Sequence, residues 1–175
     1  VTGAAGGMGR ATCLELLRDT RRRGQTLRVA AAGARPGGAL DDIVTELRAA
    51  GANASAHVAD LSDPAACARL GDEVSVAFGG LDMLFSIAGM TRSGALATLD
   101  VADWDRVFDV DVRATWLLAR ALHPALARSR GCVVAVASVS AHSPFPGLGA
   151  YSPAKAALVM LCRQLAQEWA ADGIR

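Results

Sequence analysis

The sequence lacks any apolar run close to the roughly 18 residues that a membrane-spanning helix requires, although 52% of its 175 residues are hydrophobic. Its apolar runs are short and are interrupted by glycine, arginine and aspartate. An excess of either charge is also missing, because 18 basic residues are balanced by 17 acidic ones. This balance argues against the concentrated basic face that binds nucleic acid, and we expect neither a nucleic-acid partner nor a membrane partner.

Cysteine and histidine are sparse and widely spaced. The cysteines are Cys13, Cys67, Cys132 and Cys162, and the histidines are His57, His123 and His142. Neither set shows C-x-x-C or another metal-ligand spacing, so no metal site is expected. Reduced thiols in a cytoplasmic protein are the simplest interpretation of the cysteines.

The length suits one domain over residues 1–175. The chain begins without methionine, directly on a glycine-rich turn, and it ends at Arg175. We therefore interpret it as a fragment of a domain cut on both sides.

Short β-branched runs alternate with longer stretches of helical periodicity, which is typical of an α/β protein with a parallel sheet. Gly51 is expected to end one helix, Asp63 to cap the next, and Pro124 to disturb a long one. The expected strands are residues 1–3, 27–32, 54–58, 81–87 and 132–137, and the expected helices are residues 7–19, 40–50, from 64 onward, 101–127 and 151–171. Ligands of such sheets bind beyond the carboxyl ends of the strands.

The first such end carries a glycine-rich turn, with the sequence TGAAGGMG over residues 2–9. Glycines between a strand and a helix let the backbone approach a pyrophosphate, and the helix N-terminus attracts its charge. A tight turn without a ligand is the alternative. A nucleoside-triphosphate loop is disfavoured because no G-x-x-x-x-G-K-[ST] occurs.

The second strand end distinguishes the two nicotinamide cofactors. An acidic side chain there would accept hydrogen bonds from the adenosine ribose, whereas an arginine would pair with a 2′-phosphate. Residues 33–35 contain no acid and end in Arg35. We therefore expect NADP rather than NAD, with Arg10 as a possible helper of Arg35; a solvent-facing loop arginine is the alternative.

Tyr151 and Lys155 are the strongest chemical feature. Residues i and i+4 of a helix share a face, so the ammonium is expected to stabilise the phenolate and to make Tyr151 a general acid or base. Ser138 follows the strand at residues 132–137, where its hydroxyl could hydrogen-bond a substrate oxygen. Taken singly, each is an ordinary surface residue; together with the glycine-rich turn they indicate a proton-transfer site.

These motifs together resemble the classical short-chain dehydrogenase/reductase family over the whole chain. The family's TGxxxGxG turn matches Thr2 and the glycines that follow it, its YxxxK matches Tyr151 and Lys155, and its catalytic serine matches Ser138. The resemblance implies contacts to the cofactor from Gly3, Gly7, Met8, Gly9, Arg35, Asp60, Leu61, Ala88, Gly89, Tyr151 and Lys155.

The resemblance also implies the fold and the reaction. It implies a doubly wound Rossmann-type sheet in three α/β/α layers, whose last strands and substrate lid lie beyond residue 175. Tyr151 would exchange a proton with a secondary alcohol or a ketone, Lys155 would support it and hold the nicotinamide ribose, and Ser138 would orient the substrate. Members commonly form homodimers or homotetramers, and Leu158, Leu161, Leu165 and Trp169 suit either such an interface or the core of the chain.

Three departures from the family pattern stand out. Asp111 occupies the place of an asparagine that helps hold a water of the proton relay; the main-chain carbonyl could serve equally, but a carboxylate would compete with Tyr151 for Lys155. Ser86 and Ile87 replace two asparagines, and the connection at residues 18–26 is longer than usual. The alternative that these changes favour is a weak or silent NADP-binding sensor or scaffold.

Two further expectations concern the type of reaction and the substrate. A serine hydrolase built on Ser138 and His142 is disfavoured because no G-x-S-x-G occurs. Residues 90–96 and 140–149 are expected to form walls of the substrate pocket, and the apolar character of the second segment suits an apolar carbonyl or alcohol.

Overall fold

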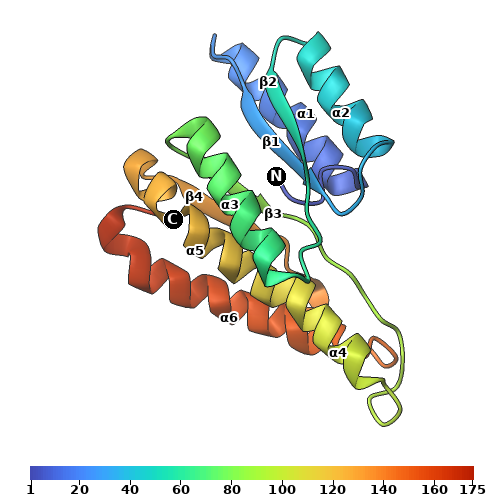
Figure 1. Cartoon of the computed structure of the whole chain (residues 1–175). Coiled ribbons are helices and arrows are strands. Elements are labelled where there is room, and N and C mark those ends of the chain that lie inside the picture. Colours follow the sequence, from blue (N-terminus) through green and yellow to red (C-terminus); the bar gives the residue numbers. More distant parts are fainter. The chain divides into compact units, whose positions relative to one another are not determined.

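The structure, a computed structural model, describes residues 1–175 and divides into two compact units (Figure 1). The first unit comprises residues 1–60 and 85–88, and the second comprises residues 61–84 and 89–175.

The first unit is built around a pair of parallel strands. Its elements in chain order are α1 (Gly7–Arg22), β1 (Arg28–Gly33), α2 (Ala39–Ala49) and β2 (Asn53–Val58). The strands pair in parallel, with Gly33 opposite Val58, and Thr2 forms a further parallel bridge to Ala32. The expected βαβ alternation is therefore present, with boundaries that shift by one to three residues.

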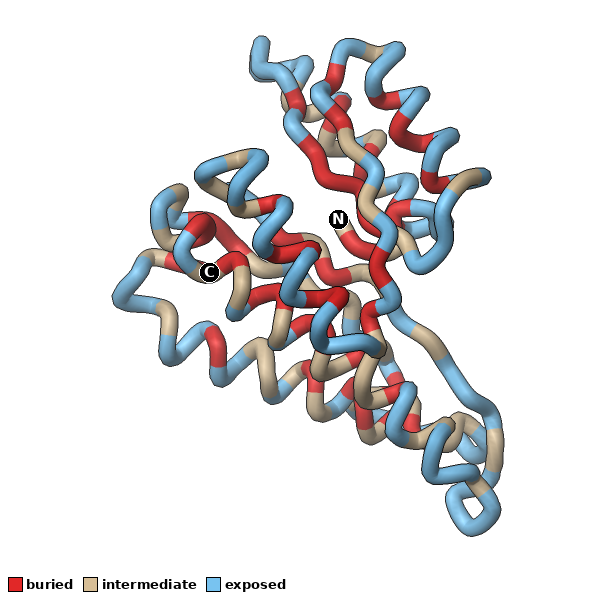
Figure 2. Tube along the Cα trace, viewed as in Figure 1, coloured by how far each residue is buried: buried red, intermediate tan, exposed pale blue.

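The core of this unit forms between the strands and α2. Four consecutive residues of β1, residues 29–32, are buried (Figure 2), as in strands covered on both faces. On α2 the buried positions recur at helical spacing, so one face of the helix is apolar. They are Leu40, Ile43, Val44 and Leu47. Gly51, with φ +86°, ends this helix as expected.

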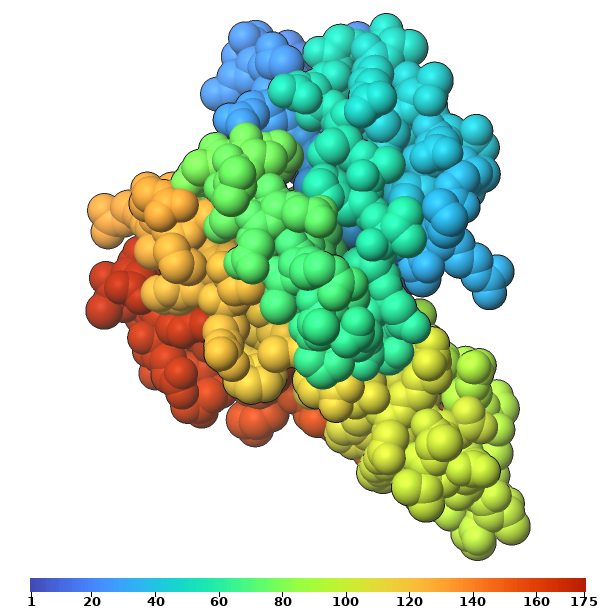
Figure 3. Space-filling model, viewed as in Figure 1, coloured from blue at the N-terminus to red at the C-terminus, as the bar shows by residue number.

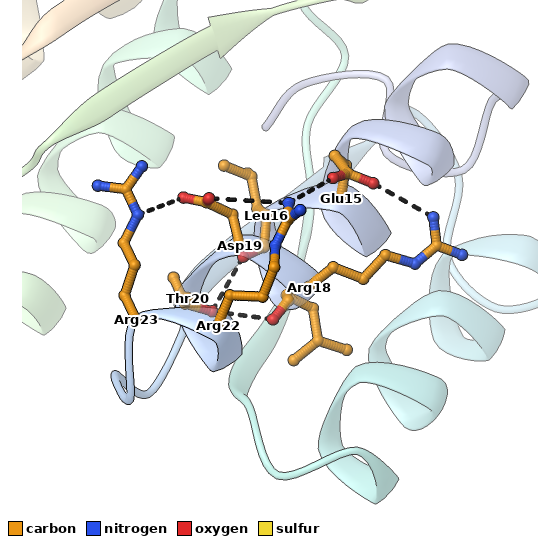
Figure 4. Close-up of polar contacts among 8 residues, drawn as sticks. Glu15, Leu16, Arg18, Asp19, Thr20, Arg22 and Arg23 are labelled. Atoms are coloured by element: carbon orange, nitrogen blue, oxygen red, sulfur yellow. Dashed lines mark hydrogen bonds and ion pairs between the residues drawn. The ribbon is translucent and has the colours of Figure 1, made fainter.

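Helix α1 extends beyond the residue at which the sequence predicted its end (Figure 4). Arg22 pairs with Glu15 at 3.0 Å and Arg23 pairs with Asp19 at 2.8 Å. Basic side chains in the last turn also interact favourably with the helix dipole. Arg21, Arg22 and Arg23 are exposed. Part of the long connection predicted at residues 18–26 is in fact the end of a helix.

The second unit is mainly helical. Its elements in chain order are α3 (Pro64–Phe78), β3 (Met83–Ser86), α4 (Val101–Phe108), η1 (Asp109–Arg113), α5 (Ala114–Ser129), β4 (Cys132–Ala135), η2 (Val139–Ala141), α6 (Tyr151–Trp169) and η3 (Ala170–Asp172). The last residues of β3 belong to the first unit. Asp63 caps α3 through Ala65 N, as predicted. Strands β3 and β4 pair. Helix α3 packs against α5, and in Figure 3 the green atoms of α3 lie beside the gold and orange atoms of α5.

The long helix expected over residues 101–127 is interrupted, but not at the predicted place. The interruption is the π-helical segment η1, whereas Pro124 lies inside an unbroken α5. Buried Leu122, Ala125 and Leu126 surround the proline, so packing offsets the backbone hydrogen bond that it removes. A π-turn is frequent at functional sites, and this one carries Asp111.

Two general expectations concern the membrane and the cysteines. None of the helices combines the length and the apolar character that crossing a bilayer requires. All four cysteines are free thiols. Burial raises the pKa of the Cys13 and Cys162 thiols, which favours their uncharged form.

Candidate active site

In the first unit, the glycine-rich turn is held by Thr2. The Thr2 side chain is buried, and its Oγ1 accepts hydrogen bonds from Ile87 N at 3.0 Å and Ala88 N at 3.1 Å. Gly3 has φ +66°, and a Cβ there would lie 3.0 Å from the Ala88 backbone. The turn thus lies against the backbone of residues 87–88, where Ser86 and Ile87 replace the asparagines of the family pattern.

Helix α1 starts at Gly7 with no side chain capping it. The first amides of a helix have no partner within the helix, so the amides of Gly7, Met8 and Gly9 stay available to an acceptor. A Cβ on Gly9 would meet Gly3 O at 2.1 Å, whereas a Cβ on Gly7 would meet nothing within 4 Å. The protein itself therefore requires glycine at position 9 but not at position 7.

Two further predicted cofactor residues lie at the same edge of this unit. Arg35 follows the end of β1 and Asp60 follows the end of β2, and these two ends are paired neighbours. Arg35 is exposed and makes no hydrogen bond or ion pair within the chain. Arg10, its suggested helper, is instead ion-paired with Glu46 of α2, so its charge is already compensated.

In the second unit, Tyr151 is the first residue of α6 and Lys155 lies one turn later. Tyr151 is half-buried and its side chain has no hydrogen bond within the chain, while the Lys155 ammonium lies 5.5 Å from the centre of the Tyr151 ring. Lys155 is 3% exposed. The geometry therefore leaves the phenol accessible and places a buried cation beside it.

Asp111 holds Lys155 directly. Its Oδ1 lies 2.8 Å from Lys155 Nζ, and its Oδ2 accepts a hydrogen bond from Met90 N at 3.0 Å. The ammonium also donates to Val136 O at 2.9 Å. Asp111 is 1% exposed, so this is a buried ion pair. Oδ2 accepts a hydrogen bond, whereas Oδ1 contacts the ammonium at ion-pair distance without making a hydrogen bond.

Gly89 makes room for this ion pair. A Cβ at position 89 would lie 2.7 Å from Asp111 Oδ1 and 3.4 Å from Lys155 Nζ. Any side chain would therefore displace the carboxylate. The glycine predicted to contact the cofactor is also required for packing around Asp111.

Ser138 follows β4 and caps the short helix η2, which packs against α6. Its Oγ accepts from Ser140 N at 3.2 Å and from Ser140 Oγ at 2.9 Å. No bond joins Ser138 to His142, which is exposed, so the hydrolase alternative gains no geometric support. Groups of three or more potential metal ligands are also absent.

The predicted pocket walls meet within the second unit. Gly94 bridges to Leu148, and Gly94 N donates to Gly147 O at 2.9 Å. Leu96 and Phe145 are exposed apolar side chains on these two segments.

The sequence did not indicate three of these partners. They are the Val136 carbonyl, the Met90 amide and the Ser140 hydroxyl. Two are backbone groups, which no residue type identifies, and only the spacing of Ser140 two residues after Ser138 was visible in the sequence.

The whole chain, residues 1–175, matches the family described as short chain dehydrogenase. The chain belongs to this family. A cis-4-hydroxycyclohexanecarboxylate dehydrogenase of Sinomonas cyclohexanicum is 37% identical over 100% of the chain and 68% of its own length. A 3-oxoacyl-[acyl-carrier-protein] reductase FabG of Staphylococcus aureus is 30% identical over 99% of the chain and 69% of its own length.

Solved structures of family members confirm the Rossmann-type α/β fold of the chain. A short chain dehydrogenase from Burkholderia cenocepacia, in complex with NADP, has a TM-score of 0.90 and 33% identity over 99% of this chain and 69% of its own. An NADH-dependent reductase A1-R′ has a TM-score of 0.90 and 28% identity over 99% and 72%.

The chain is shorter than its relatives. It spans only 36% of a dehydrogenase/reductase SDR family member 4 from Bos taurus, with 42% identity over 99 residues. It spans 55% of a short chain dehydrogenase from Pseudocercospora fijiensis, with 34% identity.

Proposed function

We propose that the protein is an NADP-dependent oxidoreductase that interconverts a secondary alcohol and a ketone or 3-oxoacyl group. The observation that carries the proposal is the pairing of an accessible Tyr151 with the buried ammonium of Lys155. These are the only tyrosine and the only lysine of the sequence, in which the other 17 basic residues are arginine. Arginine and lysine are not chemically interchangeable, so a lone buried lysine beside a lone tyrosine favours a specific chemical role for both.

Each side chain of the site would have one role. Tyr151 would pass a proton to or from the substrate oxygen, because its hydroxyl is not engaged elsewhere in the chain. Lys155 would favour the phenolate by its positive charge. Ser138 would hydrogen-bond the same substrate oxygen and hold it in place. Asp111 would act on Lys155 and not on the substrate, since both its oxygens have partners within the chain.

The glycine-rich turn fits a dinucleotide pyrophosphate. The uncapped start of α1 offers amide donors, and the open space at Gly7 allows close approach of a ligand. Gly3, Gly7, Met8 and Gly9 would hold the pyrophosphate, Asp60 and Leu61 the adenine, and Ala88 and Gly89 the nicotinamide side. Relatives solved with NADP support this assignment. When bound, the nicotinamide supplies the hydride that is exchanged with the carbinol carbon.

Substitutions of Gly9 and Gly7 distinguish a glycine that the fold requires from a glycine that the ligand requires. Gly9→Ala is expected to lower the free energy of unfolding by about 1–3 kcal/mol, because the new methyl group would overlap the Gly3 carbonyl. Gly7→Ala is expected to leave stability unchanged and to weaken NADPH binding by about tenfold, or 1.4 kcal/mol. Thermal unfolding and NADPH fluorescence titration measure the two effects. If Gly7→Ala binds NADPH as tightly as the parent, the proposal that the pyrophosphate approaches the backbone at Gly7 is wrong.

Arg35 is proposed to select NADP over NAD. It is exposed, unpaired and next to the neighbouring strand end, whereas Arg10 is compensated by Glu46. We expect Arg35→Ala to weaken NADPH binding by roughly 10- to 100-fold, as for the loss of a charge-assisted contact, and to leave NADH binding within twofold. Arg10→Ala serves as the matched control. If NADH binds the parent better and Arg35→Ala changes neither affinity, the preference for NADP is wrong.

The substrate is proposed to be apolar. Exposed Leu96 and Phe145 lie on the two segments that meet at the Gly94–Leu148 bridge. Two relatives are named for a cyclohexane carboxylate and for a 3-oxoacyl group, and both names are compatible with an apolar carbonyl or alcohol.

Assembly and location are proposed on separate grounds. Leu158 and Leu165 are buried within the chain, which favours the core interpretation for these two positions. Trp116 and Met160 remain exposed on α5 and α6, and we propose them for a homodimer or homotetramer. Free thiols favour the cytoplasm.

Hydride transfer by the full-length protein tests the function. NADPH oxidation with a panel of cyclic ketones and 3-oxoacyl thioesters is expected to give turnover that depends on Ser138, Tyr151 and Lys155. Binding of NADPH without turnover on any member of the panel would favour the sensor or scaffold alternative, which the neutralised charge of Lys155 makes physically reasonable.

A further inference from the structure

We infer that Ser140 is a positioning residue that turns the hydroxyl hydrogen of Ser138 toward the substrate. The inference rests on the proposed function, because it assigns Ser140 a task in the same proton-transfer site. The family motif does not include Ser140, and the sequence predicts it only as the first residue of a wall of the substrate pocket.

The Ser138 oxygen receives two contacts from one residue. The Ser140 amide lies 3.2 Å from Ser138 Oγ and the Ser140 hydroxyl lies 2.9 Å from it. An N–H group can only donate, so the first contact occupies one lone pair of the Ser138 oxygen. The direction of the second contact decides whether Ser138 can donate to anything else.

Burial decides that direction. Ser140 is 4% exposed, and its hydroxyl has no other partner in the chain. A buried hydroxyl that makes no donation is costly, and the only acceptor within its reach is Ser138 Oγ. Ser138 is partly exposed and does not have this constraint. Ser140 therefore donates and Ser138 accepts.

With both lone pairs of Ser138 occupied, its own hydrogen is the only part of the hydroxyl left to bond. A hydroxyl has one donor and two acceptor sites, so the remaining interaction of Ser138 must be a donation. A donor aimed at the substrate oxygen stabilises the negative charge that develops there during reduction of a carbonyl. The short helix η2 holds this geometry, because Ser138 is its N-cap and η2 packs against α6.

A double-mutant cycle in the full-length protein tests the inference. Ser140→Ala is expected to lower kcat/KM for carbonyl reduction about tenfold in the parent background, with most of the loss in kcat. In the Ser138→Ala background the same change is expected to cost less than twofold, since the hydroxyl that it orients is gone. Ser75→Ala, at a partly exposed serine of α3 outside the site, should match the parent.

The outcomes are distinct. An equal loss from Ser140→Ala in both backgrounds would show an independent structural role and would overturn the inference, as would no loss in the parent background. Unchanged NADPH affinity and thermal stability of Ser140→Ala show that the site stays folded. If the parent itself reduces no carbonyl, the proposed function fails and the inference fails with it. If the parent reduces carbonyls and Ser138→Ala reduces them more slowly, the proposed function holds, and the effect of Ser140→Ala in the two backgrounds tests the role of Ser140 separately.

Discussion

The Tyr151→Phe variant is expected to reduce carbonyl substrates about 10²- to 10⁴-fold more slowly than the parent, the range typical of a lost general acid. Phenylalanine retains the ring that lies 5.5 Å from the Lys155 ammonium, and it removes only a hydroxyl that has no partner within the chain. The loss should therefore appear in kcat rather than in folding. Steady-state NADPH oxidation at several substrate concentrations measures it.

Two controls sharpen this expectation. NADPH binding to Tyr151→Phe should stay within a few-fold of the parent, since the ammonium and the glycine-rich turn are untouched. Thermal stability of Tyr151→Phe should match that of the parent, since the removed hydroxyl has no hydrogen bond within the chain. A Tyr151→Phe variant as active as its parent would exclude the proton-transfer role and, with it, the proposed mechanism.

The Asp111→Ala variant is expected to lose about 3–5 kcal/mol of unfolding free energy, the usual cost of removing one partner of a buried ion pair. Lys155 is 3% exposed and would keep only the Val136 carbonyl as a partner, while Met90 N would lose its acceptor. An unpaired buried charge is far more costly than an absent one. Urea denaturation of the parent and the variant measures the difference.

Asp109→Ala is the matched control for this change. Asp109 lies in the same π-helical segment and pairs with Arg113 at 2.7 Å, but that pair is partly exposed, so its loss should cost about 0–1 kcal/mol. If Asp111→Ala unfolds within about 1 kcal/mol of the parent, the ion pair is not a buried structural contact.

Two further variants show whether stability depends on the negative charge of residue 111 or on its shape and hydrogen bonds. Asp111→Asn can accept with only one of its two terminal atoms, so either Lys155 or Met90 would face a donor, and an intermediate loss is expected. The double variant Asp111→Ala with Lys155→Met removes both charges and should lose less stability than the two single losses added together. Additive losses would mean that the two residues do not interact.

The order of elements could be predicted because it depends on local patterns. The glycine that ends a helix at Gly51, the cap at Asp63 and the β-branched run at residues 132–137 are all short-range signals. The glycine and the cap are where they were expected, and the run forms a strand over Cys132–Ala135. The position of the break in the long helix could not be predicted in this way. Pro124 is a strong local signal, but the buried residues around it keep α5 intact.

The sequence alone sufficed to predict the candidate residues of the site, because Tyr151 and Lys155 are one helical turn apart and Ser138 closely follows a strand. It could not indicate which partners those side chains choose. The ion pair of Asp111 with Lys155 and the bond from Met90 N join residues that different elements bring together, and the second of these involves a backbone group that no residue type marks. The contacts of Ser140 on Ser138 are local, but only the folded chain shows that the Ser140 hydroxyl is buried. Residue spacing specifies which face of a helix a side chain occupies, whereas burial and the supply of donors and acceptors depend on the folded chain.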